Sequence, residues 1–509
     1  MVAMKGMITY TNPVIPGFYP DPSVCRVGQD YYLVTSSFEY FPGVPIFHSR
    51  DLIHWRQIGH CLTRASQLPL TNVPSSGGIF APTIRYHEGI FYMITTNVSH
   101  GGNFYVFTQD PAGAWSEPIW VQQGGIDPSL CFDGEHIYFT SNDGWPQPSI
   151  YQCEIDSKSG QQRTETRLLW RGTGGRFPEG PHLYHIGDRY YLLIAEGGTE
   201  FGHMETLARS RSPWGPFEPC PHNPILTHRD QGSHPLQGTG HADLIEAHDG
   251  TWWLVFHAFR PHERLYHHLG RETCLTPVTW TEVGWLVVSR EKTVDVQMNV
   301  NALPEQREET EPARDDFETP DLRLCWNFLR NPNAEDWSLT ERPGCLRLYG
   351  SPRTLDDQDS PTFIGRRQQH FDVSAKALLD FCPENEGHEA GLTVLMNERH
   401  HYEVAVTQEQ GSRCIIVRRR IGDLVACVAR DMIEGGPVEL EIQAERDTYT
   451  FLYALAGQPA RKVATGATRY LSSEVAGGFT GVYFGMYATS NGNGRTSPAD
   501  FDWFEYLPA

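Results

Sequence analysis

The chain has 509 residues and a formal net charge of −21 at pH 7. This length exceeds one ordinary hydrophobic core, so two or more domains are expected. The acidic balance argues against nucleic acid or an anionic membrane as a partner, because both attract basic proteins. No apolar run long enough for a membrane-spanning helix occurs in the sequence.

The first residues, MVAMKGMITYTNP, lack the apolar segment of a secretory signal. The 11 cysteines are scattered singly, with no CxxC pair, which is typical of reduced thiols rather than a disulfide framework. We therefore expect a cytoplasmic protein. HExxH, Walker and GxSxG motifs are missing, so no zinc-protease, nucleotide-binding or serine-hydrolase signature is present.

One pattern occurs five times in the first three hundred residues. Each copy has a short motif marked by Pro or Gly, a short strand, a tight turn and a very apolar strand. The apolar strands are residues 31–36 (YYLVTS), 91–96 (FYMITT), 137–141 (IYFTS), 190–195 (YYLLIA) and 252–257 (WWLVFH). Copies repeat roughly every 50 residues, which indicates an all-β fold with a five-bladed β-propeller. A β-sandwich alone would not produce five such copies.

The motif that begins each copy places acidic residues on the propeller axis. The motifs are Asp21-Pro-Ser-Val, Ala81-Pro-Thr-Ile, Asp127-Pro-Ser-Leu, Glu179-Gly-Pro-His-Leu and His241-Ala-Asp-Leu. Because innermost strands line the central channel, Asp21, Asp127 and Glu179 are expected at one mouth of it. Clustered carboxylates repel one another and lose hydration, so their gathering indicates a functional site. The alternative is that each residue only caps its own turn.

Two carboxylates that face each other across a gap suit hydrolysis of a glycoside with inversion. One activates a water while the other, protonated, donates to the leaving oxygen. A third carboxylate beside the acid would raise its pKa and keep it protonated near neutral pH.

At these motifs the sequence resembles glycoside hydrolase family 43. The similarity rests on residues 16–55 (PGFYPDPSV to IHW), GGIDPSL, PEGPHLY, LLIAEGGT and LGRET. It is strongest to β-xylosidases and α-L-arabinofuranosidases with an added C-terminal β-sandwich. The resemblance implies Asp21 as general base, Glu179 as general acid and Asp127 as the residue that orients this acid and tunes its pKa. It also implies that Arg271, in LGRET, binds the sugar.

Three aromatic residues and one histidine are further candidates. Phe38, Phe80 and Trp145 lie near the motifs and are candidates for packing against a pentose, with plain core packing as the alternative. A lone His in a strand is commonly a structural residue. The resemblance nevertheless implies that His241 helps to hold Ca²⁺, or a similar divalent ion, on the axis. The chemistry itself would not require this ion.

The propeller is expected to span residues 1–303, followed by a charged linker at 304–316. Alternating strands then predict a concanavalin-like β-sandwich over residues 317–509. In the family that the chain resembles, this domain packs on the active-site rim, and the segment around Phe479 (GGFTG) is our candidate for a loop over the pocket. A free-standing carbohydrate-binding module is the alternative.

The sequence thus predicts an inverting exo-glycosidase that releases terminal xylose and α-L-arabinofuranose. Its expected partners are xylo-oligosaccharides and arabinose-substituted oligosaccharides, and a homo-oligomer is compatible with the sequence. The alternatives are an endo-arabinanase, a carbohydrate-binding propeller without turnover, and a retaining fructan-acting enzyme. A retaining fructan-acting enzyme would carry Asp-Pro-Asn-Gly, Arg-Asp-Pro and Glu-Cys motifs, which are missing from the blade motifs.

Overall fold

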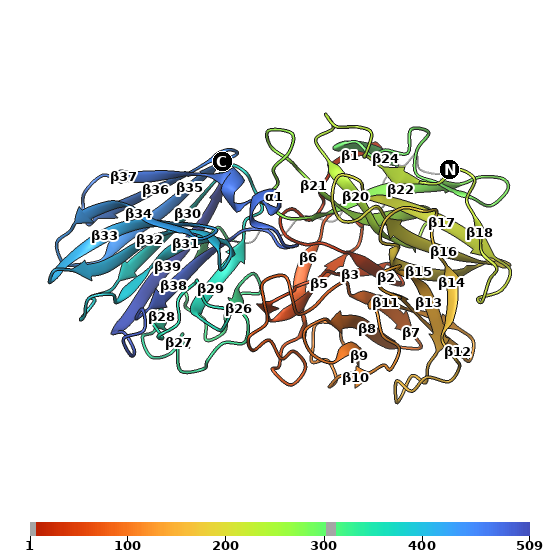
Figure 1. The fold of residues 1–509 in the computed structure, drawn as a ribbon, viewed down its shortest axis with the longest axis horizontal. Coiled ribbons are helices and arrows are strands. Elements are labelled where there is room, and N and C mark those ends of the chain that lie inside the picture. The colour runs from red at the N-terminus through yellow and green to blue at the C-terminus, as the bar shows by residue number, and fades with distance from the viewer. Residues whose placement is uncertain (1–6, 302–311) are drawn as a thin grey trace, which may run out of the picture.

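A computed structural model describes residues 7–301 and 312–509, so residues 304–311 of the predicted linker lie outside the described residues. The described chain is built almost wholly from antiparallel strands, in two domains that lie side by side (Figure 1). The predicted all-β fold, a five-bladed propeller followed by a β-sandwich, is confirmed. Within the described residues, no helix has the length and apolar character that crossing a membrane requires.

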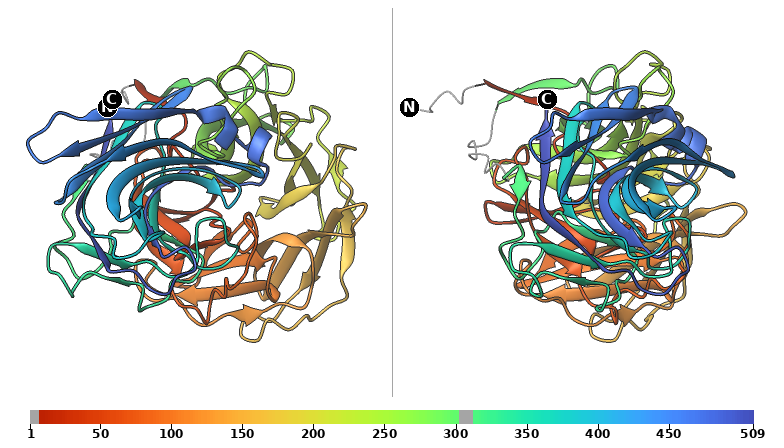
Figure 2. Two further views of the ribbon diagram at one scale, coloured as in Figure 1. Left: turned by 60° about the vertical axis from the view of Figure 1, so that its left-hand side comes forward. Right: turned by 90° about the vertical axis from the view of Figure 1, so that its left-hand side faces the viewer.

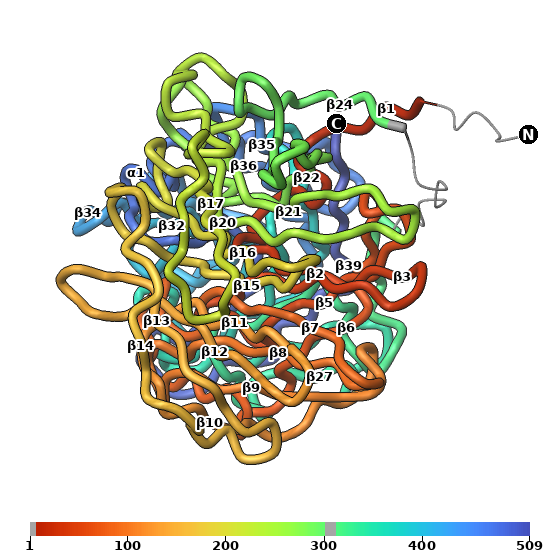
Figure 3. Tube along the Cα trace, turned by 90° about the vertical axis from the view of Figure 1, so that its right-hand side faces the viewer, coloured from red at the N-terminus to blue at the C-terminus, as the bar shows by residue number. Residues whose placement is uncertain are grey.

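The first domain contains five sheets whose strand order follows the sequence. Their innermost strands, β2, β7, β11, β15 and β20, lie toward the middle of the ring in Figure 3. The sheets are β2 (Ser23–Val27), β3 (Asp30–Val34), β5 (Gly43–Ser49) and β6 (Arg56–Leu62); β7 (Thr83–His87), β8 (Ile90–Asn97), β9 (Gly102–Thr108) and β10 (Ile119–Trp120); β11 (Ile126–Asp133), β12 (His136–Asp143), β13 (Ser149–Glu154) and β14 (Arg167–Trp170); β15 (Glu179–Ile186), β16 (Arg189–Glu196), β17 (Met204–Ser210), β18 (Glu218–Pro219) and β19 (Leu226–Thr227); and β20 (Gln237–Glu246), β21 (Trp252–Phe259), β22 (Glu272–Trp280) and β23 (Leu286–Val287).

The two ends of the first domain are joined to each other. Strand β1 (Met7–Thr11) pairs antiparallel with β24 (Gln297–Asn301). The segment that follows β1 then bonds to the fifth blade, where Ile15 and Thr273 exchange backbone hydrogen bonds of 3.1 and 3.2 Å. The ring is therefore closed by the beginning of the chain.

The second domain is a sandwich of two large sheets (Figure 2). One sheet contains β25 (Arg314–Asp315), β27 (Trp337–Ser338), β28 (Leu346–Tyr349), β30 (Val373–Asp380), β35 (Val438–Glu445), β36 (Thr448–Leu455), β37 (Arg461–Ala467) and β39 (Pro498–Pro508). The other contains β26 (Asn327–Leu329), β29 (Thr362–Arg367), β31 (Glu389–Asn397), β32 (His400–Glu409), β33 (Ser412–Ile421), β34 (Leu424–Met432) and β38 (Tyr483–Thr489). The alternating apolar residues of both sheets meet in one core between them.

The second sheet continues into the first domain. Its last strand is β4 (Tyr40–Phe41), a piece of the first domain that pairs with β26. Beside this pairing, an apolar cluster combines Phe18, Phe38 and Tyr40 of the first domain with Phe363 and Tyr483 of the second. The two domains therefore share both main-chain hydrogen bonds and a buried core.

Candidate active site

Three innermost strands carry a β-bulge at the same place. The register of β11 with β12 shifts between Ile126 and Ser129, and β15 shifts in the same way between Glu179 and His182. In β20 a shift lies between Gly240 and Asp243. A bulge re-aims the side chains next to it and is over-represented beside active sites.

The bulges hold their residues in the left-handed backbone region. Asp127 and His241 have φ values of 54° and 50°, and Asp21, just before β2, has 56°. This region is costly for residues with a Cβ, and such strain gathers at functional sites. In the fourth blade the equivalent residue is Gly180, with φ of 56°.

The motif comparison predicted that Glu179 occupies the position equivalent to Asp21 and Asp127. This prediction is wrong. Glu179 lies one residue earlier, at the position of Ile126 in the third blade. Because successive residues of a strand point in different directions, Glu179 and Asp127 approach the same space from different positions.

The motifs surround a cavity of about 280 Å³. This is a small volume for a ligand pocket and suits a single sugar unit. Its lining includes eight of the nine predicted site residues, with Trp145 as the exception. The lining residues are Asp21, Phe38, Phe80, Ala81, Ile126, Asp127, Phe177, Glu179, Gly198, Thr199, Glu200, His241, Arg271 and Phe479.

Asp21 is buried and lies against the Arg271 guanidinium. Its Oδ1 lies 2.5 Å from Arg271 Nη1, and its Oδ2 accepts a 2.6 Å hydrogen bond from Ser36 Oγ. Burial alone would raise the pKa of Asp21. Arg271, together with His241 and His257, outweighs burial and holds this pKa well below its usual value. Asp21 is therefore ionised at neutral pH.

Glu179 is in the opposite situation. Its Oε1 is buried without a hydrogen-bond partner. Burial raises the pKa of Glu179 well above its usual value, and the nearby Asp127 raises it further. Asp127 is itself buried and accepts a 3.2 Å hydrogen bond from the Gly180 N–H, while burial also raises its pKa. One cavity thus contains a carboxyl group whose pKa is lowered and another whose pKa is raised.

Two phenylalanines lie near Arg271, and a third packs against both of them. The guanidinium lies 5.9 Å from the Phe38 ring centre and 6.0 Å from that of Phe479. The Phe80 ring centre lies 5.2 Å from that of Phe38 and 6.1 Å from that of Phe479. Since Phe479 belongs to the second domain, both domains build this wall of the pocket.

Trp145 lies beside the pocket and not within it, with 78% of its surface exposed. Its ring is nearly parallel to that of Phe177, at a centre-to-centre distance of 6.3 Å and an angle of 10°. Phe177 does line the cavity but was missed in the sequence, because it lies before the motif in a segment without periodicity. Its φ of 50° is unusual for a residue with a large side chain.

His257 was not predicted as a site residue, yet His257 contacts Asp21, the proposed base. Its Nδ1 lies 3.0 Å from Asp21 Oδ1 and accepts a 3.2 Å hydrogen bond from the Asp21 backbone N–H. Its pairing with Gly240, next to His241, places it at the axis. The contact of His257 with Asp21 could be predicted only if the register of β20 with β21 were known.

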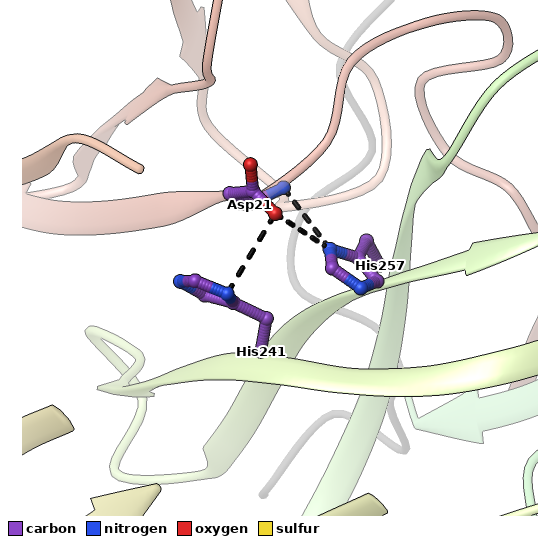
Figure 4. Close-up of side chains that lie close together, drawn as sticks. All are labelled: Asp21, His241 and His257. Carbon is purple, nitrogen blue, oxygen red and sulfur yellow. Dashed lines mark hydrogen bonds and ion pairs between the residues drawn. The ribbon is translucent and has the colours of Figure 1, made fainter. Parts of the chain in front are cut away.

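Asp21, His241 and His257 form the one metal-compatible group found among the described residues (Figure 4). Their donor atoms lie within 4.8 Å of one another. This group fits calcium poorly, because Ca²⁺ prefers six to eight oxygen ligands and two of these three donors are imidazole nitrogens. Arg271 also already neutralises the Asp21 oxygen. A calcium ion at His241 stays a prediction.

Comparison with known proteins gives two family matches. Residues 10–286 match the model described as "Glycosyl hydrolases family 43", and residues 314–507 match "Beta xylosidase C-terminal Concanavalin A-like domain". The first match covers the propeller sheets and the second covers the sandwich.

Similar proteins cover nearly the full length. The "Non-reducing end alpha-L-arabinofuranosidase BoGH43B" of Bacteroides ovatus is 46% identical over 98% of this chain and 94% of its own. A "Xylosidase/arabinosidase" of Butyrivibrio fibrisolvens is 38% identical over 98% of this chain and 99% of its own. The solved structure of "Bacteroides ovatus Xyloglucan PUL GH43B" superposes with a TM-score of 0.96, covering 99% of this chain and 100% of that one at 46% identity.

The family match covers more than half of the chain, and the relatives cover almost all of it. The resemblance seen in the motifs is thereby confirmed, and a propeller without turnover is excluded. The chain belongs to glycosyl hydrolases family 43 and is a glycoside hydrolase.

Proposed function

We propose that the protein removes one terminal pentose, α-L-arabinofuranose or β-xylose, from the non-reducing end of short oligosaccharides with inversion. The observation that carries this proposal is the pair of buried carboxyl groups whose pKa values are shifted in opposite directions within one small cavity. Inverting hydrolysis requires one ionised base and one protonated acid. The names of the similar proteins support both pentoses as substrates.

In this mechanism Asp21 is the general base. Its ionised carboxylate takes a proton from a water molecule, whose oxygen attacks the anomeric carbon of the bound sugar. Glu179 donates its proton to the glycosidic oxygen as that bond breaks, so no charged leaving group is released. Asp127 keeps Glu179 protonated through its negative charge, and Arg271 holds Asp21 ionised.

The walls of the cavity favour exo action. Phe479 of the second domain lines one side of the cavity, whose volume suits a single sugar unit. Trp145 and Phe177 present parallel aromatic faces beside the cavity, where the leaving part of an oligosaccharide can stack. An endo-arabinanase would need an open groove in place of the Phe479 wall.

The proposal is tested with aryl α-L-arabinofuranosides and aryl β-xylosides. We expect hydrolysis of both, and proton NMR of the first product should show the inverted anomer. Asp21→Ala and Glu179→Ala should each lower kcat by about 10²–10⁴-fold, with a smaller loss for Glu179→Ala on aryl leaving groups that need no proton. A retained anomer, or two fully active variants, would refute the mechanism.

A further inference from the structure

The loop that carries Phe479 forms several hydrogen bonds with the first domain. Arg271 Nη2 donates to the Phe479 carbonyl oxygen at 3.5 Å, and the Val482 N–H donates to the His268 carbonyl oxygen at 2.9 Å. This loop joins α1 (Ser473–Ala476) to β38, and the Phe479 N–H donates a 2.8 Å hydrogen bond to Ser76 Oγ. Gly478 has a φ of 83°, and a Cβ placed on it would lie 2.5 Å from the same oxygen. The two segments therefore approach as closely as a glycine allows.

Ser76 is itself held in place by Glu39. The Ser76 N–H donates a 3.0 Å hydrogen bond to Glu39 Oε2, and Ser76 has a φ of 63°, which is costly for serine. Glu39 is fully buried, and its backbone oxygen accepts a 2.9 Å hydrogen bond from the N–H of Arg330 in the second domain. Burial raises the pKa of Glu39 to about 7. Neither Glu39 nor Ser76 lines the cavity.

These two residues belong to the segments that carry the other two rings of the wall. Glu39 follows Phe38, and Ser76 lies shortly before Phe80. The segments are joined directly, because Phe38 and Ile79 exchange backbone hydrogen bonds of 2.9 and 3.1 Å. Phe38, Phe80 and Phe479 are thus connected through one hydrogen-bonded unit that spans both domains.

We propose that Ser76, held by Glu39, is a positioning residue that fixes Phe479 over the pocket and thereby sets the affinity for the terminal sugar. The inference rests on the proposed function, since it assumes that the wall with Phe479 contacts the bound sugar. Ser76 acts through Phe479 and takes no part in proton transfer, so its removal should affect binding more than the chemical step.

The test compares two neighbouring serines in the purified full-length protein. Ser76→Ala removes the acceptor of the Phe479 N–H. Ser75→Ala is the matched control, because the Ser75 hydroxyl also crosses to the second domain, where it bonds to Glu398, but does not contact Phe479. Ser76→Ala should raise KM for an aryl arabinofuranoside or xyloside about 3- to 10-fold and change kcat less than about 2-fold. Ser75→Ala should leave both within about 2-fold.

Three further variants separate positioning from a general structural effect. In a Phe479→Ala background, Ser76→Ala should no longer raise KM, because the ring that it positions is gone. Glu39→Gln keeps an oxygen acceptor for the Ser76 N–H and should retain a near-normal KM, whereas Glu39→Ala should raise it.

The outcomes distinguish the two proposals. If the wild type is active but Ser76→Ala and Ser75→Ala have the same KM, this inference is overturned and the proposed function stands. A KM effect of Ser76→Ala that persists without the Phe479 ring also overturns it. A wild type that hydrolyses neither glycoside refutes the proposed function and the inference with it.

Discussion

Asp21 and Glu179 are both buried carboxyl groups, and their neighbours decide which one holds a proton. Asp21 has the Arg271 guanidinium at 2.5 Å, which stabilises its charge. Glu179 has an unpartnered oxygen and the negative Asp127 nearby, which favours its neutral form. Base and acid are therefore assigned by the environment of each group.

Each limit of the pH profile should respond to the charge that faces the corresponding carboxyl group. Asp127→Asn removes the charge that raises the pKa of Glu179, so the acid should lose its proton earlier and the alkaline limit should fall by about one unit or more. Arg271→Gln removes the charge that lowers the pKa of Asp21, so the acidic limit should rise by about one to three units. Measurement of kcat/KM against pH checks both shifts.

Arg271→Lys is the control for the acidic limit, because it keeps the positive charge near Asp21. Its acidic limit should lie closer to that of the wild type than the limit of Arg271→Gln does. A rise of the alkaline limit in Asp127→Asn, or a fall of the acidic limit in Arg271→Gln, would contradict the assigned roles.

Removal of metal should leave the enzyme active. Since Arg271 already neutralises Asp21, and the neighbouring donors are imidazoles, the site does not depend on calcium for its charge balance. We expect chelator-treated and dialysed protein to keep kcat within about 2-fold of the untreated enzyme. A large loss that added Ca²⁺ restores would show that the axial ion predicted from the resemblance is required.

At the scale of elements, the bulges on the innermost strands bring the site together. The bulge in β15 needs Gly180, because a Cβ there would lie 2.9 Å from His241 Nε2 while the backbone stands at a φ of 56°. Glycine at this position allows the fourth blade to approach the axis and places Glu179 in the cavity.

Gly180→Ala should therefore impair both stability and catalysis. The backbone conformation alone should cost about 1–2 kcal/mol of folding free energy. The displaced His241 and Glu179 should lower kcat by about 10²-fold. Gly187→Ala is the matched control, since Gly187 lies in the hairpin after β15 with a φ of 65° and open space around its Cβ position. Equal kcat values in the two variants would exclude a role of the bulge.

Element positions also explain what the sequence could predict. Repeated turns and apolar strands predict the blades because each blade repeats the same local interactions. The sequence did not show that Glu179 lies one residue before the position of Asp127. The motif Glu-Gly-Pro resembles Asp-Pro, and only the register of β15 with β16 separates the two positions. Phe177, His257 and the strand β4 were missed because each depends on a partner distant in sequence.

At the scale of the whole molecule, the two domains form one folded unit. Arg367, which is buried, donates from Nε to the Phe18 carbonyl oxygen at 2.7 Å and from Nη1 to Asn327 Oδ1 at 2.7 Å. Its guanidinium also lies 4.5 Å from the ring centre of Tyr19 in the first domain. Together with the pairing of β4 and β26, these contacts couple the stability of the propeller to that of the sandwich.

We therefore expect a single unfolding transition in scanning calorimetry. Arg367→Ala should lower its midpoint while keeping it single, because two hydrogen bonds of a buried group are worth about 2–4 kcal/mol. Arg430→Ala is the control, since Arg430 is half exposed and its ion pair with Glu409 lies at the surface. Two separate transitions in the wild type would show that the domains unfold independently.

The pairing of β1 with β24 has a consequence for synthesis of the chain. During synthesis, strand β1 must wait for residues 297–301 before it finds its partner. Until then, the growing ring stays open and its first and last blades expose apolar edges. Biogenesis of this enzyme should therefore be most vulnerable to aggregation while the fifth blade is still being translated.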